Sequence, residues 1–525
     1  MQARKNGLLS PAAPARTELR STRMWTWVSL LAGIALAIAH ALTKLPHADE
    51  GDLASAAASF LDRGRIAFPM SYGYGASVRQ EYLLAPPFYP ASLAAWFAAF
   101  GRSLEAYRLF HVPWFVLLVV SWMQLARAAT VTRVALPIAA GLFALNYDLI
   151  NLGVSRYDVV CAALNAAAMA SFAIWRTRRF ALAVFASNCC LALAALTHPY
   201  AVFGLVGCLA IFLANGDWRR IRVQHALLAL APYAVAFGVW ALEINGNWNV
   251  LLQQIAMQAQ MRKLDFDSPV RVFMADFVVR WWQLFAGWRD GVPAIMRAKT
   301  LFLFLWGFMP FLVFRRVPGG TFALRSGIAL YCLVTLLAIP LTDDSHLQIY
   351  NLHVIAGFTA LTAIVFADFW EYAPRLRLPV LGVLAAICLS GVLGIGLRVS
   401  KRDLQHEYVP VHALLTRELV EGDIVIAPAE MGFGLGFEKY VRMDPALTSV
   451  GSGEMPRFIV ESKETGRSAP HAVACGVGAL VYDTTTYVEL PLHTPSHHYR
   501  VLSRVSAADS SVSDGRRIVN IRRCQ

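Results

Sequence analysis

Long apolar segments separated by short polar ones make up most of the chain. Eleven of the apolar segments reach or approach the roughly 20 residues that a helix needs to cross a bilayer. Charged residues are rare inside these segments and frequent in the connections between them. The pattern predicts a polytopic α-helical membrane protein with about eleven transmembrane helices, at residues 24–42, 107–126, 134–150, 158–175, 180–196, 198–213, 222–242, 299–314, 325–341, 350–369 and 376–397.

Arginine is concentrated in every second connection between these segments. A cytoplasmic N-terminus places all the arginine-rich connections inside, whereas the short connections on the opposite side hold one basic residue, Arg156. A further apolar run, Pro86 to Phe100, would be only about 22 Å long as a helix, and letting it cross would reverse this arrangement. We therefore expect that run to lie at the outer surface. The inner arginines are Arg127, Arg133, Arg176, Arg178, Arg179, Arg219, Arg220, Arg222, Arg315, Arg316, Arg375 and Arg377.

This topology predicts three parts in the chain. Residues 1–23 form a basic cytoplasmic tail, residues 24–397 form the transmembrane domain, and residues 398–525 lie outside the cell. The transmembrane domain then carries two long outer loops, 43–106 and 243–298. Each contains an amphipathic stretch suited to a helix in the membrane interface, at 53–61 and 270–285. In the outer C-terminal part, strand-like runs separated by glycine and proline predict a small α/β domain, with strands at 423–428, 479–482 and 517–521.

Composition supports a membrane protein and excludes several other classes. The chain has 525 residues, of which 57% are hydrophobic and 15% charged, whereas soluble domains have about 25% charged residues. The net charge of +13 comes from the inner connections, and the C-terminal part has equal numbers of basic and acidic residues, so no nucleic-acid partner is expected. No phosphate-binding P-loop occurs, and the glycine run 432–436 lacks the spacing of a dinucleotide fingerprint, so we interpret it as a loop.

A cluster of ionisable residues follows the first predicted span. The segment 46–52 contains three carboxylates and an imidazole at the expected outer surface. A carboxylate at the edge of a low-dielectric medium has a raised proton affinity, as a general base requires. The alternative is that Asp49 caps the following alanine-rich helix.

The order of motifs around this cluster resembles the GT-C superfamily of glycosyltransferases. The motifs are the pair Asp49-Glu50 after the first span, then 82–90 (Tyr-Leu-Leu-Ala-Pro-Pro-Phe-Tyr-Pro), Phe100-Gly101, Tyr107-Arg108 and 153–158 (Gly-Val-Ser-Arg-Tyr-Asp). Within the superfamily the chain is most similar to the protein O-mannosyltransferase and lipid A aminoarabinose transferase branch. The resemblance covers roughly the first 200 residues, and the remainder matches in general plan.

The resemblance implies transfer of a sugar from a polyprenyl-phosphate carrier to an acceptor at the outer face of the plasma (inner) membrane, with inversion. The acceptor is a glycan, a lipid or a protein. Asp49 matches the catalytic base of the family, and Glu50 completes its catalytic motif. A base removes the acceptor proton during attack on the anomeric carbon, and the phosphate leaves toward cationic groups.

Three further residues are candidates for substrate binding. Asp158 matches a second acidic position of the family, although Ser155 and Asp158 also have the spacing of a helix-capping box. Arg156 is a candidate for phosphate recognition, or else extends its charge to the membrane surface. His198 stands where relatives often have a lysine facing the donor phosphate, and it could instead simply end a helix.

Two other regions depart from the family or give no single candidate. Relatives tend to have an Arg-Tyr pair at the outer start of a late span, where this chain has Gln-Ile-Tyr-Asn at 348–351. The outer loop 243–298 offers six basic residues for a phosphate or an anionic acceptor, namely Arg262, Lys263, Arg271, Arg280, Arg289 and Arg297.

No cofactor is expected, although His47, Asp49 and Asp158 carry side chains that are ordinary metal ligands and make a divalent cation conceivable. The main alternative function is a transporter or flippase of a lipid-linked or anionic substrate. Transporters commonly place charges near the bilayer midplane and show repeated halves, whereas here the charges lie at the outer rim. A third reading is a membrane anchor whose C-terminal domain is the active part.

The topology can be tested with Arg178→Cys and Ser345→Cys, each in a background without native cysteines. A membrane-impermeant thiol reagent applied to intact cells should label position 345 and spare position 178, because the two loops face opposite sides. Labelling of 178 with protection of 345 would contradict the eleven-span topology.

Overall fold

The computed structural model describes most of the helical part of the chain and the strands of the C-terminal part. Several sequence predictions lie outside the described residues: the span at 299–314, the stretch 271–285, Gln348 and the six basic residues of the loop 243–298. The described residues are 16–72, 76–130, 132–261, 270, 321–342, 350–443, 456–462, 480–481, 486–490, 498–504, 518–520 and 523–524.

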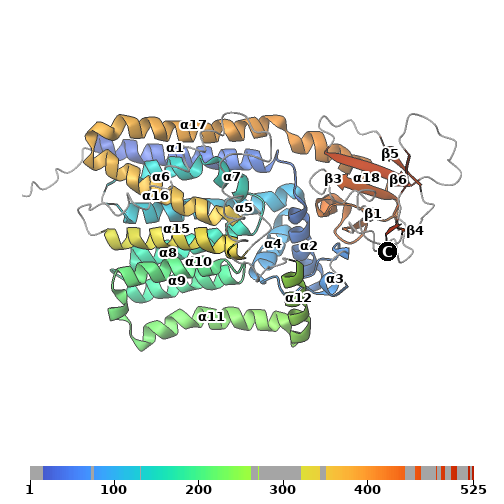
Figure 1. Ribbon diagram of the computed structural model, residues 1–525, viewed down its shortest axis with the longest axis horizontal. Coiled ribbons are helices and arrows are strands. Elements are labelled where there is room, and N and C mark those ends of the chain that lie inside the picture. Colours follow the sequence, from blue (N-terminus) through green and yellow to red (C-terminus); the bar gives the residue numbers. More distant parts are fainter. Residues whose placement is uncertain are drawn as a thin grey trace, which may run out of the picture.

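Long helices lie side by side in one bundle, with the strands beyond one end of it (Figure 1). Helix α16 lies at the centre of this bundle. Its apolar stretch is 94% buried, and it packs against α5, α6, α15 and α17. The long helices are α1 (Arg16–Ala41), α5 (Leu104–Ala128), α8 (Asp158–Trp175), α9 (Phe180–Ala195), α10 (Ala201–Ala214), α11 (Val223–Ile244), α15 (Phe322–Thr342), α16 (Asn351–Tyr372) and α17 (Arg377–Lys401).

Seven helices in the described part are long and apolar enough to cross a membrane, and one bent pair would make an eighth. The chain is therefore a multi-pass membrane protein. Helices α9 and α10 have 16 and 14 residues, fewer than the roughly 20 that a spanning helix needs. The number of eleven transmembrane helices therefore stays a prediction.

The run 134–150 does not form the single straight helix expected of it. It divides into α6 (Ala135–Ala144) and α7 (Tyr147–Gly153), which meet at 56°. The break has a local cause: Asn146 is the N-cap of α7, and its side-chain oxygen accepts the backbone N–H groups of Asp148 and Leu149 at 2.9 and 3.1 Å. A capping residue takes an extended conformation, which ends the preceding helix.

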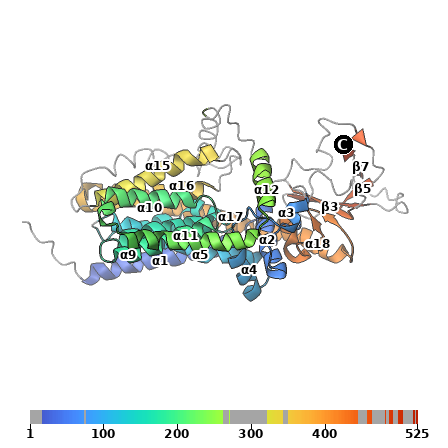
Figure 2. The ribbon, with the colours of Figure 1, turned by 90° about the horizontal axis from the view of Figure 1, so that it is seen from below.

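Four shorter helices lie between the bundle and the strands. They are α2 (Ala48–Arg63), α3 (Ala76–Gln80), α4 (Phe88–Phe100) and α12 (Trp248–Met261), and α2, α3 and α12 stand in this position in both views (Figures 1 and 2). The amphipathic stretch 53–61 lies inside α2. Helix α4 has 13 residues, about 20 Å, which is too short for a core of about 30 Å and agrees with a surface position.

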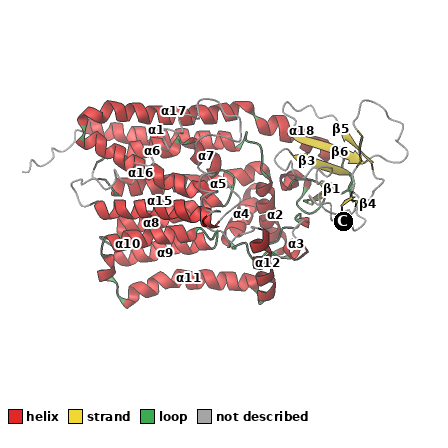
Figure 3. Cartoon of the chain, in the orientation of Figure 1, coloured by secondary structure: helices red, strands yellow, loops and turns green. Residues whose placement is uncertain are grey.

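The C-terminal part contains a six-stranded sheet, drawn in yellow in Figure 3, beside helix α18 (Val409–Glu418). The strand order is β2-β1-β3-β6-β5-β7; β1 is parallel to β2 and β3, and the other pairs are antiparallel. Each of the three runs expected to form strands contains one, namely β1, β4 and β7. The strands are β1 (Val425–Ile426), β2 (Val441–Arg442), β3 (Phe458–Ser462), β4 (Leu480–Val481), β5 (Thr486–Leu490), β6 (Tyr499–Arg504), β7 (Ile518–Asn520) and β8 (Arg523–Cys524).

The C-terminal part docks directly on helix α2. A Cβ atom at Gly51 would lie 2.1 Å from the carbonyl group of Ala429, so only glycine permits this approach of the two backbones. Next to it, the Met443 N–H donates to the Met70 carbonyl at 2.7 Å, and the Tyr72 N–H donates to the Met443 carbonyl at 3.1 Å. The first outer loop and the C-terminal sheet are therefore joined by backbone contacts.

Gly51→Ala should loosen this contact, because the added methyl group overlaps backbone atoms that cannot rotate away. We expect a loss of about 1–3 kcal/mol in stability, seen as faster hydrogen exchange of residues 425–443. Gly382→Ala on α17, where nothing lies within 4 Å of the added atom, is the matched control. Equal exchange in the two variants would show that the close approach does not hold the C-terminal part in place.

Candidate active site

The carboxylate cluster lies at the first turn of α2, and the residue that caps the helix is His47. Its Nδ1 accepts the backbone N–H of Asp49 at 3.2 Å, while the Glu50 side chain accepts the backbone N–H of His47 at 3.3 Å. This reciprocal pair is a capping box. The alternative that Asp49 caps the helix is therefore wrong, and its carboxylate is available for other contacts.

Glu50 is completely buried and paired with a buried arginine of α5. Arg108 Nε lies 2.8 Å from the Glu50 carboxylate, and its Nη1 donates to the carbonyls of Ala41 and Lys44 at 2.8 and 2.7 Å. One guanidinium thus ties together the end of α1, the start of α2 and the start of α5. Glu50 fixes the first turn of α2, which carries Asp49.

Arg156 contacts both Asp49 and Asp158, so three of the candidate residues expected from the sequence lie together. Its Nη1 lies 2.6 Å from Asp49 Oδ2, and its Nε lies 3.1 Å from Asp158 Oδ2. The Asp158 side chain is fully buried, that of Arg156 is 7% exposed, and that of Asp49 is 37% exposed. A buried cation is therefore held between one inaccessible carboxylate and one accessible carboxylate.

The capping box expected of Ser155 and Asp158 does not form. Asp158 is the first residue of α8, and Tyr157 occupies the cap position without a side-chain hydrogen bond. The Ser155 hydroxyl instead accepts from the Lys44 ammonium at 3.4 Å. Asp158 is paired with Arg156 at 3.1 Å.

The ring of Tyr157 contacts both His198 and Arg156. The Nδ1 atom of His198 accepts the Tyr200 N–H at 3.2 Å, which orders the junction between α9 and α10, and the His198 ring stacks on Tyr157 at 5.0 Å. The Arg156 guanidinium lies over the rings of Tyr157 and Tyr350, 5.2 and 5.9 Å from their centroids. His198 thus stabilises the junction between α9 and α10. Its role in substrate binding stays a prediction.

Two polar residues lie at the start of α16: Asn351, in the segment 348–351 noted in the sequence, and His353, which was not anticipated. The side-chain amide of Asn351 and both ring nitrogens of His353 are buried and have no hydrogen-bond partner among the described residues. Tyr200 packs edge-on against His353 at 5.6 Å. Buried polar groups are normally satisfied by protein or water, so this cluster has spare capacity for a polar ligand. The only sequence signal was two polar residues at the start of an otherwise apolar run.

The pKa values of Asp49 and Asp52 are shifted in opposite directions. Burial raises the pKa of the Asp49 carboxyl, but the charge of Arg156, with a smaller contribution from His47, outweighs this and holds it below the usual value. The raised proton affinity expected of this cluster is therefore wrong for Asp49. It applies to Asp52, because burial and the neighbouring Asp49 charge raise its pKa to about 7 against a hydrogen bond from Ser71.

The ligand set suggested by the sequence, His47, Asp49 and Asp158, surrounds a guanidinium in part. No three His, Cys, Asp or Glu side chains among the residues that the structure describes are placed to hold one. The Arg156 guanidinium lies against both Asp49 and Asp158 and supplies the positive charge that a cation would provide.

Comparison with solved structures shows that the chain has the fold of ArnT and AglB, two GT-C glycosyltransferases, in agreement with the resemblance seen in the sequence. ArnT from Cupriavidus metallidurans, solved with undecaprenyl phosphate, matches with a TM-score of 0.55 and 14% identity over 94% of this chain and 99% of its own. The oligosaccharyltransferase AglB from Archaeoglobus fulgidus, solved with an inhibitory peptide and a dolichol-phosphate, matches with a TM-score of 0.52 and 13% identity over 97% and 77%. No protein-family model and no curated protein matches the sequence.

The raised pKa of Asp52 predicts a pH-dependent effect of Asp52→Asn. Because the pKa of Asp52 is about 7 in the folded protein, against an ordinary value of 3.8, the folded state binds this proton more tightly than the unfolded state. Stability therefore falls as pH rises from about 4 to about 7. The variant, which cannot ionise, should unfold at a higher temperature than the wild type near pH 8 and at the same temperature near pH 4. Thermal unfolding in detergent measures this.

Asp62→Asn is the control for that experiment. Its hydrogen bond to Arg102 lowers the pKa of Asp62, so the substitution should give no gain near pH 8. An Asp52→Asn shift of the same size at both pH values would contradict the assignment.

Proposed function

We propose that the protein is a glycosyltransferase that moves a sugar from a polyprenyl-phosphate carrier to an acceptor hydroxyl at the outer face of the plasma membrane. In this proposal the N-terminus is cytoplasmic and the C-terminal domain lies outside. The observation that carries it is the buried Arg156 cation, held between Asp49 and Asp158 at the end of an apolar bundle. The fold supports it, since ArnT and AglB with this fold were solved with undecaprenyl phosphate and dolichol-phosphate.

Asp49 is the general base of the proposed reaction. Its accessible carboxylate takes the proton of the acceptor hydroxyl while the oxygen attacks the anomeric carbon. The bond from that carbon to the phosphate oxygen breaks on the opposite face, and its electron pair leaves with the carrier phosphate. Attack opposite to the leaving group gives inversion at the anomeric carbon.

Arg156 couples donor binding to activation of that base. A guanidinium prefers two parallel hydrogen bonds to a phosphate or carboxylate, so the donor phosphate competes with Asp49 for Arg156. Before the donor binds, the 2.6 Å contact with Arg156 holds the pKa of Asp49 low and makes it a weak base. When the phosphate takes over the arginine, the proton affinity of Asp49 rises toward the value that base catalysis needs.

The surrounding residues have positioning and binding roles in this scheme. Asp158 keeps the Arg156 guanidinium in place during the exchange, because it is buried on the far side. Glu50, through Arg108, holds the first turn of α2, which carries Asp49. His198, Asn351 and His353 supply polar atoms around the donor headgroup.

Asp49→Asn tests the base. The amide has nearly the same shape but cannot accept the proton, and base catalysis contributes about 10²–10⁴-fold, so turnover should fall at least about a hundredfold while donor binding persists. The assay is sugar transfer from a purified polyprenyl-phosphate sugar in liposomes, with folding checked by thermal unfolding. Because His47 caps α2, a loss of activity in this variant cannot be attributed to a lost cap.

Asp52→Asn is the matched control, one turn further along the same helix. It should keep turnover within about tenfold, because only Asp49 is paired with the arginine proposed to bind the phosphate. Near-normal turnover in Asp49→Asn together with a large loss in Asp52→Asn would move the base to Asp52. Near-normal turnover in both variants would reject this mechanism.

A further inference from the structure

Two successive residues at the start of α5 hold the two segments that form the candidate site. Arg108 is paired with Glu50 and so fixes the first turn of α2. Tyr107 reaches the other segment, because its hydroxyl donates to the backbone carbonyl of Ser155 at 2.8 Å. Ser155 directly precedes Arg156, so this bond fixes the backbone from which the Arg156 side chain extends.

The bond from Tyr107 lies in the interior of the protein. Tyr107 is fully buried and Ser155 is 3% exposed, so water has little access to replace a lost hydroxyl. The Tyr89 hydroxyl lies 3.2 Å from that of Tyr107 and restricts it further. A buried carbonyl that loses its donor is destabilised. Removing the Tyr107 hydroxyl would therefore leave the Ser155 backbone less firmly held.

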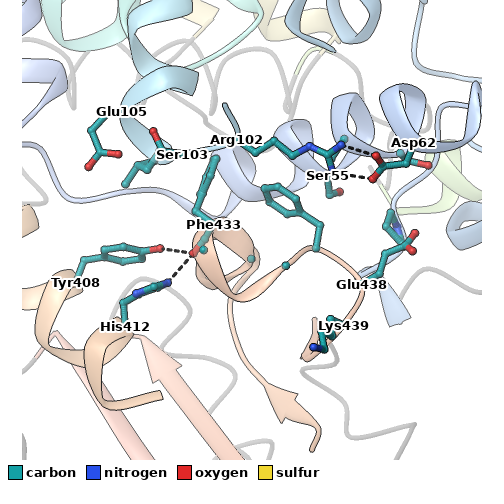
Figure 4. A pocket seen from close by; sticks show the side chains of 18 of the residues that line it. Ser55, Asp62, Arg102, Ser103, Glu105, Tyr408, His412, Phe433, Glu438 and Lys439 are labelled. Atoms are coloured by element: carbon teal, nitrogen blue, oxygen red, sulfur yellow. Dashed lines mark hydrogen bonds and ion pairs between the residues drawn. The ribbon is translucent and has the colours of Figure 1, made fainter. Parts of the chain in front are cut away.

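The C-terminal part contacts the ring of the same tyrosine. The Phe433 ring packs against Tyr107 with the two centroids 5.6 Å apart and an angle of 61° between the planes. The Tyr408 hydroxyl and the His412 Nε2 atom lie 3.4 and 2.8 Å from the Phe433 carbonyl (Figure 4). A Cβ atom at Gly434 would lie 2.5 Å from His412 Nε2. The backbone that presents Phe433 to Tyr107 is therefore tightly restrained.

The segment 429–433 also touches the first turn of α2. It approaches the backbone of that helix at Gly51, two residues after Asp49. The Glu430 carboxylate accepts a hydrogen bond from the Tyr499 hydroxyl at 3.0 Å, and this bond joins the segment to strand β6. The segment 429–433 thus connects the sheet to both halves of the candidate site.

We propose that Tyr107 is a positioning residue that sets the Arg156 guanidinium against Asp49, and that the C-terminal part orients Tyr107 through Phe433. The proposal rests on the function proposed above and adds a role for the C-terminal part, which keeps the base and the phosphate-binding cation in register. Without the Tyr107 hydroxyl, the Ser155 backbone shifts and Arg156 leaves the Asp49 carboxylate for part of the time.

The effect is measurable at Asp49. The charged groups around this carboxyl are Arg156, His47 and Asp52. Burial raises the pKa of Asp49, and the charge of Arg156 outweighs burial and lowers it. A looser contact with Arg156 therefore raises the pKa of Asp49. His47 and Asp52 are the same in every variant below, so a difference between variants reports the arginine.

The experiment uses full-length protein in lipid nanodiscs. A water-soluble carbodiimide with glycinamide labels protonated carboxyl groups, and peptide mass spectrometry gives the extent of labelling at each pH. The midpoint of labelling at Asp49, whose side chain is 37% exposed, follows its pKa. Asp62 on the same helix, with a side chain that is 52% exposed, is the internal reference.

Two variants test the two parts of the proposal, and each has a matched control. Tyr107→Phe removes only the hydroxyl. Its control is Tyr233→Phe on α11, where the buried hydroxyl has no hydrogen-bond partner among the described residues. Phe433→Leu removes the ring that contacts Tyr107. Its control is Phe458→Leu on β3, since Phe433 and Phe458 are 3% and 2% exposed and both substitutions remove similar packing from the C-terminal part.

Tyr107→Phe should raise the labelling midpoint of Asp49 by about one pH unit, because an adjacent opposite charge lowers a carboxyl pKa by about 1–3 and part of that effect is lost. Phe433→Leu should move the midpoint in the same direction by a smaller amount. Both controls should leave it unchanged, and the midpoint of Asp62 should be the same in all variants. Thermal unfolding checks that each variant is folded.

The transfer assay gives a second measurement. The acidic limb of the pH profile of kcat/KM reports the pKa of the base in the free enzyme, so it should move to higher pH in Tyr107→Phe. The kcat should fall about tenfold to a hundredfold, as expected when reacting groups are displaced, because the donor phosphate then binds a displaced guanidinium. A purely structural role for Tyr107 would lower the amount of folded protein and leave the pH profile unchanged.

An unchanged Asp49 midpoint in Tyr107→Phe, or the same change in Tyr233→Phe, would overturn the role of Tyr107. The same change in Phe433→Leu and Phe458→Leu would overturn the role of the C-terminal part. The labelling is independent of the transfer reaction. If Tyr107→Phe moves the midpoint while Asp49→Asn leaves transfer intact, the positioning role stands and the proposed base fails.

Discussion

The site depends on a positive charge that is almost withdrawn from water. Arg156 is buried because two carboxylates, from different segments, offset the cost of its desolvation. Removing Arg156 would leave two carboxylates without their cation, and breaking a buried pair in this way typically costs about 3–5 kcal/mol. The buried Arg108–Glu50 pair lies beside it and fixes one of those segments. Two arginines thus set the position of the accessible Asp49 carboxylate: Arg108 through Glu50, and Arg156 directly. At Arg156, a donor phosphate can take the place of that carboxylate.

Sequence patterns predicted the parts of the fold that depend on neighbouring residues. The span predicted at 158–175 coincides with α8, and the short run ending at Phe100 is the short helix α4. The pattern failed at 134–150, because the side chain of Asn146 starts a new helix within an apolar run. Hydropathy averages over many residues, whereas a cap depends on one side chain.

The candidate site was only partly visible in the sequence, for a related reason. Asp49, Arg156 and Asp158 were selected from their motifs, and the structure brings them into contact. The Glu50–Arg108 pair spans 58 positions, and no local pattern indicates such a contact. Capping was the alternative role considered for Asp49, because aspartate is a common cap, whereas the imidazole of His47 accepts the bond. His353 was missed because a histidine at the start of an apolar helix resembles a packing residue.

Helices α1 and α17 pack together and end at the same level of the bundle. There the Leu404 N–H donates to the Thr43 carbonyl at 2.9 Å, and the Gln405 side chain donates to the Leu42 carbonyl at 3.0 Å. Beyond this tie, α1 leads to Asp49 and α17 leads to Tyr408, whose hydroxyl reaches the Phe433 carbonyl. Membranes of different thickness change the tilt of the helices that cross them. Since the two helices are fastened at this end, a change of tilt carries the base and the segment 429–433 together, and the spacing between them is insulated from the thickness of the surrounding lipid.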